Sequence, residues 1–254
     1  MNRAGGGVAI SVVTVVRNGA ATIGGCLASV AAQTRAAEHI VVDGASSDRT
    51  AQIVREFRPP VARLVSEPDG GLYDAMNKGI ALAGGEVVGT LNADDVYADD
   101  AVLAQVAAAF ADPAVGLSYG DLEYVDRADP RRVVRRWRAG EFSPRSFYRG
   151  WMPPHPTVFV RRGLYERWGG FDTGLGTAAD YELLVRLLLR HRVAAAYIPR
   201  VLVRMRRGGA SNRTFGARLL AHRMDRRAWA VNGLRPLPWT LPLKPLRKLG
   251  QFLR

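Results

Sequence analysis

The sequence predicts an α/β fold with a mostly parallel central sheet and helices on both of its faces. Two observations lead to this prediction. In the N-terminal part, short runs rich in Val and Ile alternate with helix-like segments. The runs are almost continuously apolar, as expected for strands that helices cover on both sides. Strands that alternate with helices in this way form right-handed βαβ units with parallel strands.

Four strand and helix pairs are expected before Asp112. The run VAISVVTVV is the first strand, and EHIVVDG contains the second, which ends at Asp43. Ser46, Ser47 and Asp48 follow it and can cap the next helix through their side-chain oxygens. The expected strands are residues 8–16, 38–43, 61–67 and 86–92, and the expected helices are residues 20–33, 48–57, 72–83 and 99–110.

The pattern changes after Asp112, where strand-like segments follow one another with few helices between them. A helix is nevertheless expected over residues 179–190, followed by a short strand over 194–199. We therefore expect residues 1–112 to form the parallel half and residues 113–214 a mixed extension of its sheet. The other strand-like segments are residues 116–126, 131–137 and 157–162.

Positive charge is concentrated near the C-terminal end. The formal net charge is +13, and 13 of the 36 Lys and Arg residues lie from Arg204 onward, with a single acid, Asp225. Residues 215–254 are thus expected to be a basic amphipathic appendage that includes Trp229 and Trp239. Such a segment suits an anionic surface, and we favour a membrane over nucleic acid. The alternative is ordinary solvated arginine in an arginine-biased sequence.

The composition excludes several classes of protein. The single cysteine, Cys26, cannot form an internal disulfide or a thiolate metal cluster. No uncharged stretch reaches the roughly 20 apolar residues that span a bilayer, and no apolar leader precedes the first strand. We therefore expect a cytoplasmic protein of a reducing compartment, neither exported nor membrane-spanning.

Acidic and amide side chains follow three of the expected parallel strands. Ligands of an open parallel sheet bind outside the carboxyl ends of its strands, so these side chains should meet at one edge. Any one of them could instead be a helix cap, but their coincidence indicates a site. The residues are Asp43, Glu67, Asp69, Asn92, Asp94 and Asp95.

A glycine loop for phosphate is not found. The turn after the first strand, RNGAATIGG, does not fit G-x-G-x-x-G, and no G-x-x-x-x-G-K-[ST] motif is present. Clustered carboxylates are instead the hard oxygen ligands that Mg²⁺ or Mn²⁺ prefers, and such a metal bridges diphosphate oxygens. The pattern therefore indicates a nucleotide-diphosphate substrate.

Three long motifs resemble the family 2 inverting glycosyltransferases, which use the GT-A fold: VVTVVRNGAATIGGCLASVAAQT, HIVVDGASSDRT and SEPDGGLYDAMNKGIALAGGEVVGTLNADD. The resemblance continues through HPTVFVRRGLYERWGGFD and AADYELLVRL to about Asn212. The string SEPDGGLYDAMNKG is similar to the branch used in bacterial exopolysaccharide, lipopolysaccharide or colanic-acid-like assembly. The resemblance implies a nucleotide-sugar donor, a glycan or lipid-linked acceptor, and a divalent metal.

The resemblance also implies roles for residues on the donor side. Asp43 and Ser46 would contact the nucleotide at its base side, and Asp69, Asn77 and Lys78 would lie along the nucleotide and its diphosphate. The string NADD takes the place of the family's D-x-D motif, which puts Asn92 and Asp94 at the donor and Asp94 and Asp95 at the metal. Asn92 departs from the Asp of many relatives, which leaves weaker metal binding or a water-bridged contact open.

On the acceptor side, Asp180 is the candidate general base, at the position that holds the base in the family. It shares a helical stripe with Leu184 and Leu187 and should point inward, whereas Glu182 should point away from the stripe. The alternative for Asp180 is a purely structural role, in which its negative charge interacts with the helix dipole. Further candidates for acceptor or phosphate contacts are His155, Trp151 and Arg206.

These observations predict a metal-dependent glycosyltransferase that acts in bacterial cell-surface glycan synthesis, in the cytoplasm or peripherally on the inner face of the membrane. Two alternatives stay open. A metal-dependent sugar nucleotidyltransferase shares the architecture but lacks its glycine- and lysine-bearing loop here. A non-catalytic polyanion-binding protein would explain the basic C-terminal region but not the acids at the strand ends.

Overall fold

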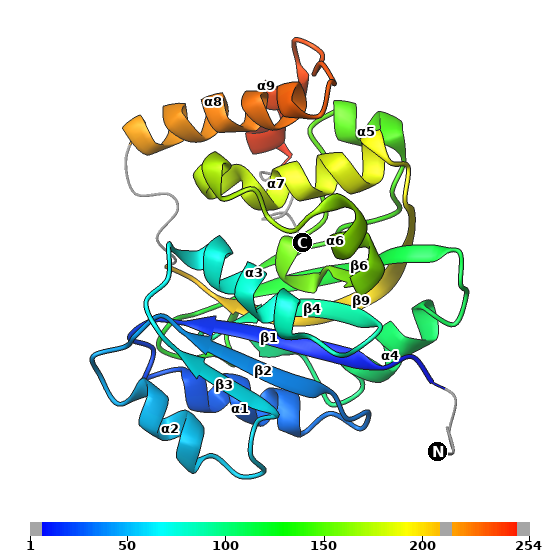
Figure 1. Cartoon of the computed structure of the whole chain (residues 1–254). Coiled ribbons are helices and arrows are strands. Elements are labelled where there is room, and N and C mark those ends of the chain that lie inside the picture. Colours follow the sequence, from blue (N-terminus) through cyan, green and yellow to red (C-terminus); the bar gives the residue numbers. More distant parts are fainter. Residues whose placement is uncertain (1–6, 209–214, 248–254) are drawn as a thin grey trace.

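The structure is a computed structural model that describes residues 7–208 and 215–247 (Figure 1). One mixed sheet runs through it in the strand order β3-β2-β1-β4-β8-β6-β9-β5, with β7 paired to β6. The expected α/β fold is confirmed. The strands are β1 (Ile10–Val16), β2 (Glu38–Asp43), β3 (Arg63–Ser66), β4 (Val87–Asn92), β5 (Val96–Tyr97), β6 (Val115–Val125), β7 (Val133–Trp137), β8 (Phe159–Arg161) and β9 (Ala194–Arg206).

The parallel half of the sheet consists of β3, β2, β1 and β4. Its register aligns the carboxyl ends of the strands: Asp43 lies beside both Val16 and Ser66. Asn92 pairs with Val15 on the other side of β1. The strand ends that carry the candidate donor residues therefore form one edge, as the sequence predicts.

The second half of the sheet is mixed. Strand β8 is antiparallel to β4 and β6, whereas β6 and β9 are parallel. Strand β9 is much longer than the expected residues 194–199, because the pairing with β6 continues beyond a register shift near Pro199. Proline has no N–H to donate and is tolerated in a sheet at such a bulge.

Helices cover both faces of the sheet (Figure 1). Helices α1 and α4 pack with Val12 of β1, and α3 packs on the opposite face with Val13 and Val15. These alternating valines bury both faces, which explains the continuous apolar run of the first strand. The helices are α1 (Ile23–Ala31), α2 (Thr50–Glu56), α3 (Leu72–Leu82), α4 (Val102–Ala109), α5 (Pro144–Tyr148), α6 (Arg162–Trp168), α7 (Ala179–Leu184), α8 (Phe215–Val231) and α9 (Thr240–Leu246).

The expected helix over residues 179–190 is α7 followed by a π-helical segment, η3 (Val185–Arg190). Before α7 lies a 3₁₀ segment, η2 (Thr173–Ala178), and a further one, η1 (His155–Thr157), precedes β8. Asp180 therefore lies in the first turn of α7, above the sheet.

The two C-terminal helices pack on α7. Trp229 of α8 has an exposed fraction of 0%, and Leu241 of α9 is buried in the same core as Tyr181. The expectation that Trp229 belongs to a membrane-facing appendage is therefore wrong, because its ring closes the core above α7. Within the described ranges, no helix is both long and apolar enough to cross a membrane.

Candidate active site

The first group of site residues lies at the ends of β2 and β3. Asp43 is fully buried and accepts hydrogen bonds from the hydroxyls of Ser46 and Ser66, the latter at 2.6 Å. Gly44 lies against Asp69, and a Cβ at Gly44 would overlap the Asp69 carboxylate. The structure thus brings together Asp43, Ser46 and Asp69, as expected. Both carboxylate oxygens of Asp43 accept hydrogen bonds from serine hydroxyls.

The loop after β1 joins this group through Asn18, a residue that the sequence analysis missed. Its backbone N–H donates to Ser46 Oγ at 2.7 Å, and its side-chain oxygen accepts from the backbone of Ser47 at 2.9 Å. Asn18 adopts a φ of 53°, a conformation that Asn tolerates better than most residues. An open groove of about 690 Å³, which both Ser46 and Ser66 line, adjoins these loops. It is a candidate place for a nucleotide base.

The NADD motif lies at the end of β4. Asp95 has an exposed fraction of 1%, and its Oδ2 accepts a hydrogen bond from Asn92 Nδ2 at 3.1 Å. Burial, together with the neighbouring charge of Asp94, raises the pKa of Asp95 to about 8. Asp94 is exposed to solvent. The motif therefore combines one exposed and one buried carboxyl group.

This motif suits a divalent cation. Asn92 Oδ1 and Asp95 Oδ1 are buried and have no hydrogen-bond partner among the described residues. Buried oxygens without a partner are costly, and a hard cation would satisfy them. Within the described ranges, no three His, Cys, Asp or Glu side chains form a preformed metal site. Mg²⁺ is commonly held by one or two carboxylates plus substrate phosphates, so this donor set fits.

The end of β9 lies beside the same motif. Arg206 lies beside Asp95, and its positive charge opposes the rise in the pKa of Asp95. The Arg206 side chain points to the backbone carbonyl of Arg127, at 3.4 Å. Arg206, a candidate for a phosphate contact, is thus adjacent to the candidate metal ligands.

Asp180 lies across from helix α3. The hydroxyl of Tyr73, in the first turn of α3, lies beside Asp180. Burial, and then the charge of Asp180, raise the pKa of Tyr73 well above its usual value. His155 is a second neighbour: burial lowers its pKa, while the negative charge of Asp180 acts to raise it. Asp180 is partly exposed, which leaves it accessible to a substrate hydroxyl.

The ring of Phe171 contacts the rings of both Tyr73 and His155. Its ring centroid is 5.2 Å from that of Tyr73 and 5.4 Å from that of His155. Asn77 on α3 bonds to both backbone polar groups of Phe171. The Asn77 amide is therefore engaged within the protein, and its expected contact with the diphosphate stays a prediction.

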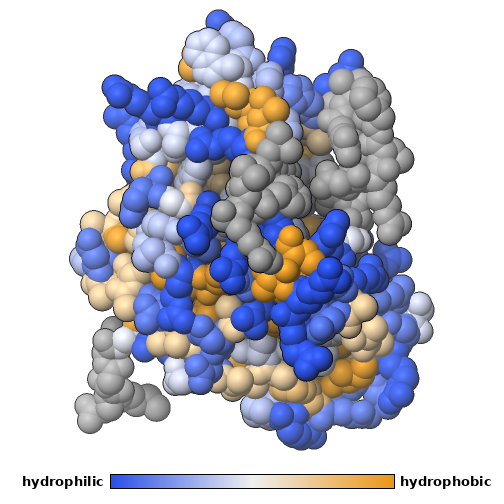
Figure 2. Space-filling model, turned by 180° about the vertical axis from the view of Figure 1, so that it is seen from behind, coloured by the Kyte–Doolittle hydropathy of each residue, from blue (hydrophilic) through white to orange (hydrophobic). Residues whose placement is uncertain are grey.

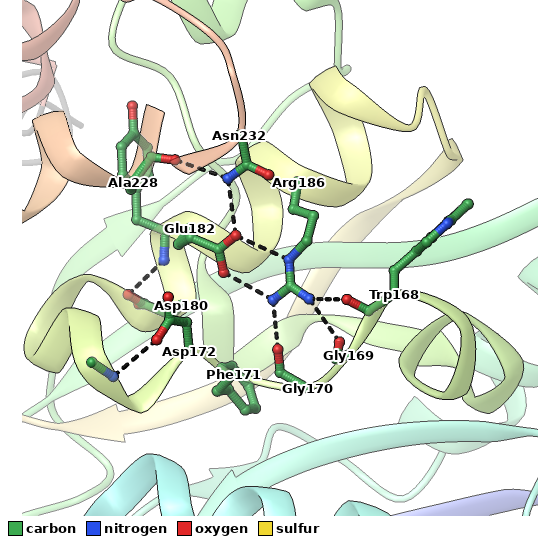
Figure 3. A network of polar contacts seen from close by, with 12 residues as sticks. Trp168, Gly169, Gly170, Phe171, Asp172, Asp180, Glu182, Arg186, Ala228 and Asn232 are labelled. Atoms are coloured by element: carbon green, nitrogen blue, oxygen red, sulfur yellow. Dashed lines mark hydrogen bonds and ion pairs between the residues drawn. The ribbon is translucent and has the colours of Figure 1, made fainter. Parts of the chain in front are cut away.

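The side chain of Glu182 points inward, and the expectation that it points away is wrong (Figure 3). It has an exposed fraction of 3% and forms a two-pronged ion pair with Arg186, with distances of 2.9 and 2.8 Å. Asn232, directly after α8, donates to the same carboxylate at 2.9 Å. Arg186 in turn donates to the backbone carbonyls of residues 168–170. This network ties α8 to the loop that contains Phe171 and fixes the position of α7.

Trp151, expected as a candidate acceptor or phosphate contact, is buried in the core. Its indole N–H donates to the carbonyl of Ala139 at 2.7 Å, and its ring is buried among the rings of Tyr119, Phe142 and Phe147. Trp151 therefore serves the core and offers no face to an acceptor sugar.

Lys78 remains on the donor side. Its ammonium pairs with Glu67 at 2.9 Å and donates to the carbonyl of Pro68 at 2.9 Å. These partners lie directly before Asp69. Lys78 is thus held at the edge where the sequence places it, beside the loop that leads into α3.

Comparison with known proteins agrees with this arrangement. Glycosyl transferase family 2 matches residues 11–165. A glycosyltransferase of Mycobacterium tuberculosis, described as uncharacterized, is 34% identical over 188 residues, which cover 71% of this chain and 69% of that protein.

Two solved structures share the fold. S. aureus TarS 1–349 in complex with UDP-GlcNAc has a TM-score of 0.66 at 20% identity, over 96% of this chain and 71% of that one. The mannosyltransferase PcManGT from Pyrobaculum calidifontis, in complex with GDP-Man and Mn²⁺, has a TM-score of 0.64 at 24% identity, over 96% and 70%. The fold is thus that of the GT-A glycosyltransferases, and the chain belongs to glycosyltransferase family 2.

Proposed function

We propose that this glycosyltransferase moves a sugar from a nucleotide-sugar donor to an acceptor hydroxyl with inversion at the anomeric carbon. One observation carries the proposal: Asp180 lies beside Tyr73 of α3, the helix whose Asn77 holds the loop at Phe171. Tyr73 follows Asp69 by four positions at the donor edge, whereas Asp180 belongs to the second half of the chain. A partly exposed carboxylate is therefore held beside the edge where the donor would bind.

In this mechanism residues 1–112 hold the donor and residues 113–214 receive the acceptor. Asp43 and Ser46 bind the base side of the nucleotide, and Asp69 and Lys78 lie toward the diphosphate. Asp180 accepts the proton of the acceptor hydroxyl while that oxygen attacks the anomeric carbon. The bond between the anomeric carbon and the diphosphate oxygen breaks on the opposite side, and the nucleoside diphosphate leaves with the electron pair.

Asn92, Asp94 and Asp95 would hold a divalent ion, Mg²⁺ or Mn²⁺. When bound, such an ion neutralises negative charge on the departing diphosphate. The unpartnered oxygens of Asn92 and Asp95 support this assignment, as does the Mn²⁺ in the PcManGT complex. Arg206 lies close enough to the motif to add a positive charge on the same side.

We propose a lipid-linked or polysaccharide acceptor of cell-surface glycan synthesis, met at the inner face of the cytoplasmic membrane. Support comes from the motif SEPDGGLYDAMNKG and from the basic C-terminal region. The family membership disfavours both the nucleotidyltransferase and the non-catalytic polyanion binder.

Incubation with UDP-, GDP- and dTDP-sugars plus Mn²⁺ tests the proposal. A glycosyltransferase releases a nucleoside diphosphate in an acceptor-dependent manner, and NMR of the product reports the anomeric configuration. Retention of configuration would reject the inverting mechanism. Consumption of a nucleoside triphosphate and sugar phosphate would support a nucleotidyltransferase instead.

A further inference from the structure

The C-terminal helices expose apolar side chains. Among the described residues, five large hydrophobic side chains are exposed, and four of these lie between residues 231 and 246. Trp239 has an exposed fraction of 51% and Leu246 one of 55%. Scattered exposed apolar residues are ordinary, but a local concentration of them indicates an interaction surface. The four residues are Val231, Leu237, Trp239 and Leu246.

Helix α9 is apolar on two sides. Thr240 and Leu241 are buried against the core, and Thr240 Oγ1 donates to the carbonyl of Tyr148 at 2.6 Å. Trp239, Pro242 and Leu246 recur at the spacing i, i+3 and i+7, which places them together on the opposite side. We refer to Leu237, Trp239, Pro242 and Leu246 as the α9 surface.

The sequence that forms the α9 surface carries charge of one sign. From Arg226 to the end of the sequence there is no Asp or Glu. Arg235 and Arg247 are exposed on either side of the surface in the sequence. The nearest preceding acid, Asp225, is paired with Lys244 at 2.8 Å. At the top of the molecule in Figure 2, hydrophobic surface lies beside strongly hydrophilic surface.

We propose that the α9 surface docks on a bilayer that contains anionic phospholipid. Leu237, Trp239 and Leu246 enter the boundary between headgroups and acyl chains, and Arg235 and Arg247 contact the lipid phosphates. Tryptophan is enriched at this depth because its ring is apolar and its N–H is polar. A second copy of the chain fits less well, since a symmetric contact would bring the same basic residues together.

The same helices hold the helix that contains Asp180. The indole N–H of Trp229 donates to the Tyr181 hydroxyl at 2.9 Å. The Lys244 ammonium lies 3.5 Å from the centre of the Tyr181 ring. The α9 surface is therefore fixed relative to α7. The proposal identifies an anionic bilayer as the partner of the site that contains Asp180. It rests on the proposed function in one respect only, that this site is the active site.

Vesicle co-sedimentation tests the proposal, with vesicles of phosphatidylcholine alone and of phosphatidylcholine and phosphatidylglycerol in equal parts. The parent protein should bind the anionic vesicles and not the neutral ones. The double substitution Trp239→Ser/Leu246→Ser should weaken this binding about tenfold or more, because the apolar anchors are lost. Leu72→Ser is the matched control, since Leu72 has an exposed fraction of 50% outside the α9 surface, and it should bind as the parent does.

A second measurement reports depth. Phospholipids brominated in the acyl chains should quench tryptophan fluorescence, and Trp239→Phe should reduce that quenching, because the other four tryptophans are buried or half-buried. Absence of binding, equal binding to neutral vesicles, or equal loss in Leu72→Ser would overturn the proposal. So would a dimer that Trp239→Ser/Leu246→Ser abolishes. Acceptor-dependent release of nucleoside diphosphate, measured without vesicles, judges the proposed function separately.

Discussion

The side-chain amide of Asn77 holds Phe171 by two hydrogen bonds, one to each backbone polar group of that residue. Asn77 Nδ2 donates to the carbonyl of Phe171 at 2.9 Å, and the N–H of Phe171 donates to Asn77 Oδ1 at 2.8 Å. The two residues are 94 positions apart in the sequence. This contact joins α3, at the donor edge, to the loop that leads to Asp180.

Substitution of Asn77 by Ala should therefore weaken both folding and catalysis. Two partly buried backbone groups of Phe171 lose their partners, which costs about 2 kcal/mol in the free energy of unfolding. The turnover number should fall because the contact between Tyr73 and Asp180 loosens. Urea unfolding and donor turnover measure the two effects. Unchanged turnover with reduced stability would show that Asn77 has a purely structural role.

Substitution of Asp180 by Asn should abolish transfer and leave the fold intact. Removal of a general base typically costs 10² to 10⁴ in rate, or about 3 to 5 kcal/mol in the barrier. Donor affinity should persist, because Asn keeps the size and the hydrogen-bonding capacity of Asp180. Tyr73→Phe removes only the hydroxyl that lies beside Asp180 and should produce a smaller loss. If Asp180→Asn transfers sugar within a few-fold of the parent rate, another group is the base.

Substitution of Glu182 by Gln should destabilise the protein. It leaves the guanidinium of Arg186 buried without its anionic partner, which costs about 3 kcal/mol or more. Glu166→Gln is the matched control, because Glu166 pairs with Arg162 at the same i, i+4 spacing but is solvent-exposed. The control should change the free energy of unfolding by less than about 1 kcal/mol. Equal effects of the two substitutions in urea unfolding would contradict the burial of this network.

Chelation and pH should affect turnover through Asp95. Excess EDTA and Asp95→Ala should each remove most activity, whereas Asp100→Ala, at an exposed carboxylate nearby, should not. Because the pKa of Asp95 without a cation is about 8, a proton competes with the metal at lower pH. The metal concentration for half-maximal activity should therefore fall as the pH rises toward 8. Full activity in EDTA would exclude the metal-dependent mechanism.

Stability should decrease in acid because of His39. Burial lowers the pKa of His39 to about 4, so the unfolded chain binds a proton near pH 6.5 that the folded chain does not. This contribution to stability is complete above about pH 6.5 and is lost as the pH falls toward 4, up to about 3 kcal/mol. His39→Gln should flatten this part of the stability profile. A parallel profile in the variant would assign the pH dependence to other groups.

The parallel half of the fold was predictable because its signal is local. Its strands are short apolar segments rich in valine, and β2, β3 and β4 each end in a polar residue that marks the edge. The far end of β9 was not predictable, because Pro199 suggests a strand end. Only the register shift opposite Gly120 and Asp121 shows that the strand continues.

The site was predictable where residue types are tied to strand ends, as for Asp43 and the NADD motif. The role of Asn77 was hidden because its partner lies far away in the sequence. Glu182 carried a signal that could have been used: Arg186 follows at i+4 within a run of leucines, a spacing that favours a buried ion pair over two solvated charges. Trp229 and Trp239 look alike in the sequence, and only the packing of α8 and α9 distinguishes them.

The closure of the core by Trp229 has a consequence for synthesis of the chain on the ribosome. Trp229 emerges 48 positions after Tyr181, the residue to which it bonds. Until then the apolar rings of Tyr181 and Phe147 lack the cover that they share with Trp229 in the folded protein. A nascent chain that stalls in this interval would offer that surface to chaperones and proteases. We therefore expect the donor-binding half to mature first, and the helix with Asp180 to become ordered only when α8 has been made.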